Sequence, residues 1–98
     1  MNQMKPRARS SWQDYLGRDV YTADNQQIGL VVDVRTDPQS RELYLIVQDS
    51  ADPSAQPLCI PAEAVGVATR FRLMLDLVSD RLPKDEWSQL DFRVLHPA

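Results

Sequence analysis

The sequence predicts an all-β fold, a small barrel or rolled sheet with one short helix near the C-terminus. Three observations favour it. Apolar residues recur mainly with a period of two from Tyr15 onward, which is typical of strands that bury one face. Turn sequences separate these stretches at intervals of about 8–14 residues, as in small barrels. Helical spacing occurs in one segment near the end of the chain.

Alternation is clearest in three stretches, residues 28–34, 43–47 and 71–77. The larger apolar side chains of each stretch stand at every second position, so we expect them on one buried face. Shorter strands are predicted at residues 19–22, 58–60 and 65–69. The predicted core residues of the three longer strands are Ile28, Leu30, Val32, Val34, Leu43, Leu45, Val47, Phe71, Leu73, Leu75 and Leu77.

The connections carry turn chemistry of their own. Asn25 follows Asp24 between two predicted strands, and asparagine tolerates the left-handed conformation of a tight hairpin. Residues 37–40 form a second turn, in which proline follows an aspartate. Residues 49–56 form a longer polar loop. Prolines on both sides of residues 58–60 indicate a short strand at the edge of the sheet.

The helical candidate begins near Pro83 and continues through residues 84–90. Proline is favoured at a first helical position, and the acidic residues 85 and 86 suit the first turn. Trp87 and Leu90 stand three residues apart and share a face, which we expect to pack on the barrel.

Composition excludes several classes of protein. The 98-residue chain has a net charge of −3; residues 1–11 carry +3, and the remainder holds 8 basic and 14 acidic residues, a net −6. One cysteine cannot form an intramolecular disulfide. No apolar run reaches the ~20 residues of a membrane helix, and no signal sequence follows the basic start. We therefore expect a soluble, cytoplasmic protein without membrane insertion.

The chain shows no pattern that indicates catalysis. His96 is its only histidine, and no serine or cysteine has a base and an orienting group to work with. Cys59 lies in a predicted strand and is interpreted as a core or edge residue. The aspartates lack the glycine-containing pattern of a calcium loop. We expect a non-enzymatic protein with no cofactor and no metal.

Three of the predicted strands carry apolar residues on both faces. Tyr44 and Ile46 oppose the core residues of their strand, and Val31 and Met74 do the same in theirs. The outer face must then be covered, either by the C-terminal residues Trp87, Leu90 and Phe92 or by another subunit. The second alternative predicts a two-fold homodimer, which Ile46→Asp would disrupt while the barrel stays folded. The candidate interaction surface is Val31, Tyr44, Ile46, Met74 and Trp87.

Three segments together resemble the PRC-barrel domain family. Residues 16–34, LGRDVYTADNQQIGLVVDV, are similar to its opening strand, turn and I-G-x-V-x-D-V pattern. Residues 37–47, DPQSRELYLIV, are similar to D-P-x-T-G followed by Y-L-V-V, and residues 59–65, CIPAEAV, match a later proline step. Asn25 and Arg41 stand where the family usually has glycine. The resemblance implies a barrel of about six strands.

The resemblance covers residues 15–78 and divides the chain into three predicted parts. Residues 1–14 form a flexible basic tail, residues 15–78 the PRC-barrel-like domain, and residues 79–98 a helix and tail that pack on the barrel. Members of the family occur in the photosynthetic reaction centre, in ribosome-maturation factors and as stand-alone proteins, and we expect a stand-alone member. The expected function is a protein–protein interaction module that forms a homodimer. The alternative is an RNA- or ribosome-associated adaptor.

We predict that the protein does not bind nucleic acid tightly. An acidic barrel repels phosphate, and a tail that neutralises about three phosphates provides little affinity at physiological salt. An electrophoretic shift titration in ~0.15 M salt should show no submicromolar complex with RNA or duplex DNA. Submicromolar affinity would favour the adaptor function instead.

Overall fold

The structure, a computed structural model, describes residues 12–97. They form seven strands: β1 (Asp19–Tyr21), β2 (Gln27–Thr36), β3 (Leu43–Gln48), β4 (Leu58–Pro61), β5 (Val65–Ala68), β6 (Arg72–Leu75) and β7 (His96–Pro97). The helical segments that follow β4 and β6 are η2 (Ala62–Ala64), η3 (Ser79–Arg81), α2 (Lys84–Gln89) and η4 (Phe92–Val94), of which α2 is an α-helix and the others are 3₁₀ helices.

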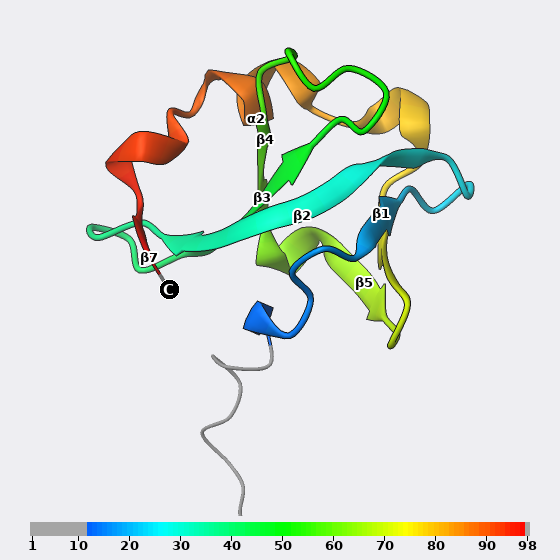
Figure 1. The fold of residues 1–98 in the computed structure, drawn as a ribbon, viewed down its shortest axis with the longest axis horizontal. Coiled ribbons are helices and arrows are strands. Elements are labelled where there is room, and N and C mark those ends of the chain that lie inside the picture. The colour runs from blue at the N-terminus through cyan, green and yellow to red at the C-terminus, as the bar shows by residue number, and fades with distance from the viewer. Residues whose placement is uncertain (1–11, 98) are drawn as a thin grey trace, which may run out of the picture.

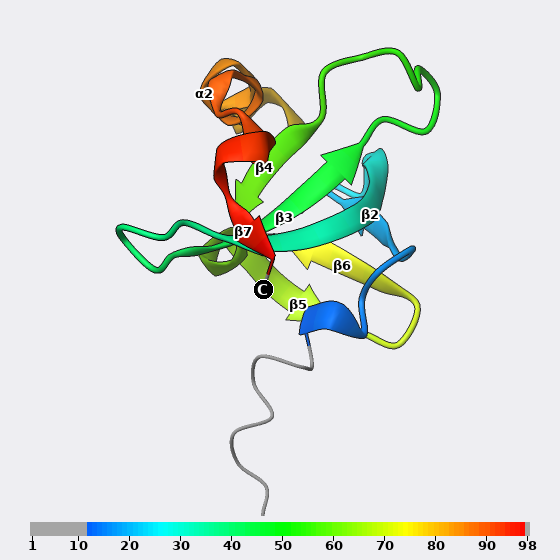
Figure 2. The same ribbon diagram turned by 60° about the vertical axis from the view of Figure 1, so that its left-hand side comes forward.

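The strands form one curled sheet in the order β4-β3-β2-β1-β6-β5, with β7 added to β2 (Figure 1). Neighbouring strands are antiparallel except β1 and β6. The two end strands, β4 and β5, are not paired, so the sheet curls without closing (Figure 2). The predicted all-β, barrel-like fold with one short helix after it is confirmed.

Two local features shape the long strand β2, a close approach of β3 at Gly29 and a bulge at Val32. An added Cβ at Gly29 would lie 2.3 Å from the carbonyl oxygen of Gln48, so β3 can approach only a glycine there. The pairing with β3 then shifts between Val31 and Asp33, which marks a bulge at Val32. The bulge turns Val32 outward, where it is 48% exposed, and buries Val31 in the core. The prediction that strict alternation buries Val32 and leaves Val31 on the outer face was wrong.

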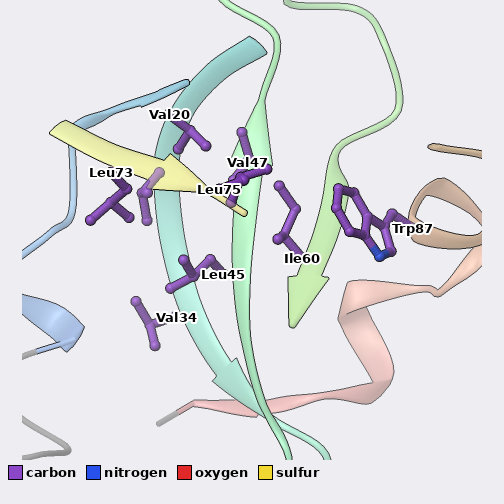
Figure 3. Packing of buried hydrophobic residues seen from close by; sticks show 9 residues of the cluster. Val20, Val34, Leu45, Val47, Ile60, Leu73, Leu75 and Trp87 are labelled. Carbon is purple, nitrogen blue, oxygen red and sulfur yellow. The ribbon is translucent and has the colours of Figure 1, made fainter. Parts of the chain in front are cut away.

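Two apolar clusters hold the sheet together. The larger lies inside the curl and joins the inward residues of five strands to Trp87 from α2 (Figure 3). The smaller lies on the outer face of β3 and β4, where Ile46 and Cys59 pack against Leu95, with Tyr44, Leu90 and Phe92 around them. The buried members of the larger cluster are Val20, Val31, Val34, Leu45, Val47, Ile60, Leu73, Leu75 and Trp87.

The outer face of β3 was predicted to be covered either by the C-terminal residues or by another subunit. The smaller cluster shows that the C-terminal residues cover it at Ile46. Ile46 is only 1% exposed, and the C-terminal segment provides its neighbours. Trp87 contributes to the larger cluster instead of covering Ile46, and it is 5% exposed. Burial within one copy means that Ile46 and Trp87 cannot offer the exposed apolar contact that was predicted for them.

Arg35 fastens the C-terminal segment to β2. Its Nε lies 2.6 Å from a carboxylate oxygen of Asp33, and its Nη1 donates to the carbonyl oxygens of Phe92 and Leu95 at 3.3 Å. The guanidinium also stacks over the Phe92 ring, 5.5 Å from its centroid. Pairing of β7 with β2 completes the attachment.

The turns follow the expected chemistry. Asn25 adopts a φ of 68°, and the carboxylate of Asp24 accepts hydrogen bonds from the backbone N–H and the hydroxyl of Ser79 at 2.9 and 2.8 Å. These bonds tie the β1–β2 turn to η3. Arg41 adopts a φ of 66° at the second position where the family usually has glycine. Both residues therefore adopt the left-handed conformation that glycine favours.

Two boundaries differ from the prediction. Trp12 packs against the core beside Tyr15, with ring centroids 5.7 Å apart, so residues 12–14 do not belong to a flexible tail. The rest of the predicted tail lies outside the described residues. Phe71 is 78% exposed because it lies in the turn before β6, where strand alternation does not apply.

Ile46→Asp should therefore destabilise the fold itself. An unpaired carboxylate in the smaller cluster should reduce the free energy of unfolding by about 3 kcal/mol or more. Val32→Asp is the matched control on the neighbouring strand, and its effect should stay within about 0.5 kcal/mol because Val32 is exposed. Urea denaturation followed by circular dichroism measures both. Equal denaturation midpoints for wild type and Ile46→Asp would contradict the burial of this residue.

Candidate functional site

Tyr44 and Trp87, two of the predicted interaction residues, line one groove between the β3–β4 pair and α2. Cross-strand pairing places Tyr44 beside Pro61 on one wall. Helix α2 packs next to β4 and provides the facing wall (Figure 2). The lining residues are Glu42, Tyr44, Cys59, Pro61, Glu63, Glu86, Trp87, Gln89 and Leu90.

The other predicted interaction residues do not join this groove. Val31 lies in the larger cluster and Ile46 in the smaller one. Met74 is half-buried on the outward side of β6, between the buried residues Leu73 and Leu75, and pairs across the sheet with Tyr21 and Val67. The five residues were predicted to belong to one interaction surface. The structure instead places them in separate parts of the molecule.

The groove has the dimensions and the chemistry of a binding site. Its volume is about 470 Å³, within the range of roughly 300–1,000 Å³ typical of ligand pockets. Tyr44, Pro61, Trp87 and Leu90 give it apolar and aromatic walls. Such walls favour a ligand that has apolar parts as well as charge.

Carboxylates give the groove its electrostatic character. The chain contains three glutamates, and all three line this groove. They come from three separate places in the chain: Glu42 immediately precedes β3, Glu63 lies in η2 and Glu86 in α2. Within residues 12–97, no three acidic, histidine or cysteine groups are placed to hold a metal ion. The carboxylates are therefore dispersed around the groove, and none of the described residues that line it is basic.

Tyr44 is held in place by Glu42. Its hydroxyl donates a hydrogen bond of 2.9 Å to the carboxylate of Glu42. Burial, with a further contribution from this carboxylate, raises the pKa of Tyr44 from 10.0 to about 12. The phenol therefore stays neutral at physiological pH, and its ring is fixed on the groove wall.

Cys59 lies beneath the groove and is not activated. Its thiol donates to the carbonyl oxygen of Leu90 at 3.3 Å. Burial, with a smaller contribution from Asp91, raises the pKa of the Cys59 thiol from 9.0 to about 11. The thiol therefore remains protonated at neutral pH, and this agrees with its interpretation as a core residue.

Sequence reasoning missed the acidic character of this site. Glu86 was interpreted only as a favourable residue for the first helical turn, and Glu42 and Glu63 attracted no interpretation. The available signal was compositional, because acidic residues elsewhere in the chain are all aspartates. Three glutamates at isolated positions in the sequence are weak evidence for an acidic site, because only the fold shows that the three positions lie together.

A curled, mostly antiparallel sheet with a short helix over one edge is the architecture of a small barrel-like β module. The sequence pattern of the PRC-barrel domain matches residues 9–82 of the 98. The chain therefore belongs to the PRC-barrel domain family. No curated protein matches it. Among residues 12–97, no helix has the length and the apolar composition needed to span a bilayer.

The shifted pKa values predict a loss of stability at high pH. Between pH 9 and about 11, the folded chain keeps a thiol proton that the unfolded chain releases. Ionisation therefore favours the unfolded state, and stability falls as pH rises through this range. Tyr44 acts in the same direction between pH 10 and about 12.

Thermal melts of wild type and Cys59→Ala test this dependence. The Tm of the wild type should fall more steeply than that of Cys59→Ala as the pH rises from about 8.5 to 10.5. The variant should start from a lower Tm, because the cavity left by the sulfur weakens packing at every pH. Parallel pH profiles would show that Cys59 does not titrate as its burial requires.

Proposed function

We propose that this PRC-barrel protein is a non-enzymatic interaction module that self-associates as a homodimer, and that the groove beside α2 is its docking surface. The groove carries this proposal because it combines aromatic walls with three carboxylates around an open space. Such a combination suits a protein segment that has both apolar and charged side chains. The chemistry requires no cofactor.

The arrangement of the elements supports a docking role. The C-terminal segment covers the outer face of β3 and β4 at Ile46, but the groove begins where this cover ends, at Tyr44 and Leu90. One wall belongs to the sheet and the other to a helix that is packed through Trp87. Walls fixed by a buried core are preorganised, which reduces the entropic cost of binding.

The alternative function as an RNA- or ribosome-associated adaptor has less support. Residues 12–98 hold 14 acidic and 8 basic residues, and the groove itself is acidic. Phosphate recognition requires concentrated lysine and arginine. The alternative depends on a resemblance to domains of ribosome-maturation factors, and a shared fold alone does not imply a shared function.

We also propose that the protein acts in the cytoplasm. Cys59 is a free, buried thiol, and a reducing compartment suits an isolated cysteine. The family contexts known from the resemblance, a reaction-centre subunit and ribosome-maturation factors, are both parts of larger assemblies, which is compatible with an interaction module.

Gln89→Arg should weaken self-association without affecting folding. Gln89 is exposed on α2 and lines the groove, so a longer cation there fills the space and pairs with the glutamates. We expect the dimer dissociation constant to rise at least about tenfold, which corresponds to ~1.4 kcal/mol. Sedimentation equilibrium over a range of concentrations measures it.

The matched control is Gln26→Arg, which adds the same charge at an exposed position in the β1–β2 turn. This variant should self-associate like the wild type. A wild type that stays monomeric at high micromolar concentration would overturn the proposed homodimer.

A further inference from the structure

We infer that the groove binds residues 1–11 of a second copy of this chain, with Lys5, Arg7 and Arg9 placed among the three glutamates. This inference rests on the proposed function and names the segment that docks. It follows from the charges on both sides, from the chemistry of the groove walls, and from the place where the described chain begins.

The groove has carboxylates without partners of opposite charge. The ion pairs within residues 12–97 are Arg35 with Asp33 and Arg93 with Asp91, and neither includes a glutamate. Glu63 and Glu86 are exposed, and the hydrogen bond that the Glu42 side chain accepts from a described residue comes from the neutral Tyr44 hydroxyl. Three like charges around one space repel one another, so a cationic occupant lowers their energy.

Residues 1–11 have the complementary composition. They hold three basic residues and no acidic residue, whereas residues 12–98 have a net charge of −6. The basic residues stand at alternate positions, 5, 7 and 9. In an extended bound segment, alternate side chains face the same side at a spacing of about 7 Å. Such a segment can present three cations together to the separate carboxylates of the groove.

The walls favour arginine in particular. A guanidinium can bind a carboxylate through two hydrogen bonds and stack on an aromatic ring at the same time. The groove offers both partners at one place, because the Tyr44 hydroxyl is hydrogen-bonded to the Glu42 carboxylate and both residues line the groove. Two of the three basic residues in the segment are arginines.

A second copy is the better source of this segment. The described chain begins at residue 12, and this blue start of the ribbon lies at the opposite end of the molecule from α2 in both views (Figures 1 and 2). Eleven residues span at most about 40 Å when fully extended, and Arg9, which stands three residues before Trp12, reaches only about 10 Å beyond it. In a two-fold dimer, each copy can place its first residues in the groove of the other, and one contact is then formed twice.

The direct test uses a fluorescent peptide of residues 1–11 as the probe. The receptor is the full chain carrying Lys5→Ser, Arg7→Ser and Arg9→Ser, so that its own segment does not compete. Fluorescence anisotropy should show saturable binding that weakens as salt is added. Adding Glu63→Gln and Glu86→Gln to the receptor should weaken binding at least about fivefold.

Asp14→Asn with Asp80→Asn is the matched control, because it removes the same charge at exposed positions outside the groove. It should change the affinity less than about twofold. Equal weakening by both pairs would overturn the inference, because binding would then depend only on net charge. No binding at peptide concentrations up to about 1 mM would also overturn it.

Charge exchange shows whether the contact joins two copies. One full chain carries Lys5→Glu, Arg7→Glu and Arg9→Glu, and another carries Glu63→Lys and Glu86→Lys. Each alone should associate at least about tenfold more weakly than the wild type. Mixed together, they should form a heterodimer, because each segment then meets a groove of opposite charge.

The outcomes separate this inference from the proposed function. If both variants dimerise like the wild type, the segment does not hold the dimer, and self-association through another contact stands. If the peptide binds but the wild type sediments as a monomer, the segment occupies the groove of its own copy, and both proposals are overturned.

Discussion

The bend of β2 is the constraint on which the rest of the structure depends. This strand pairs with β3 along one edge, and with β1 and then β7 along the other. A straight strand could not serve both halves of a curled sheet, and the bend needs two local features. Gly29 allows the backbone of β3 to approach, and the bulge at Val32 changes the twist between the β1 and β7 halves. Curvature brings the inward side chains of distant strands into one cluster.

The C-terminal segment completes both apolar clusters of the curled sheet. A strand with apolar residues on both faces needs two covers, and this short stretch of chain contributes to both. Trp87 enters the larger cluster, whereas Leu95 packs on Ile46 from outside. Arg35 secures this arrangement, since it hydrogen-bonds two carbonyl groups of the segment and stacks on Phe92. The groove exists because the cover stops short of Tyr44.

Charge is separated along the chain and in space. The first residues are basic, the glutamates are gathered at the groove, and the aspartates serve mainly in turns, as Asp24 and Asp37 do. Aspartate suits turns because its short side chain reaches nearby backbone N–H groups, whereas glutamate extends further from the backbone and can line an open space. The family fold provides rigid walls, and the side chains on those walls provide the specificity.

The sequence by itself determined the features that depend on local chemistry, namely the strands, the turns and the start of the helix. Alternation located the strands, Asn25 marked a left-handed turn, and Pro83 stood immediately before the helix. The order and spacing of these features also indicated the family. Tertiary structure decided the position of the bulge, which buries Val31 and exposes Val32, because a bulge is needed only when the sheet curls. It also decided that Ile46 is covered within one copy. The site could not be predicted for the same reason: its three glutamates are isolated in sequence, and only the packing of α2 beside β4 brings them to one groove.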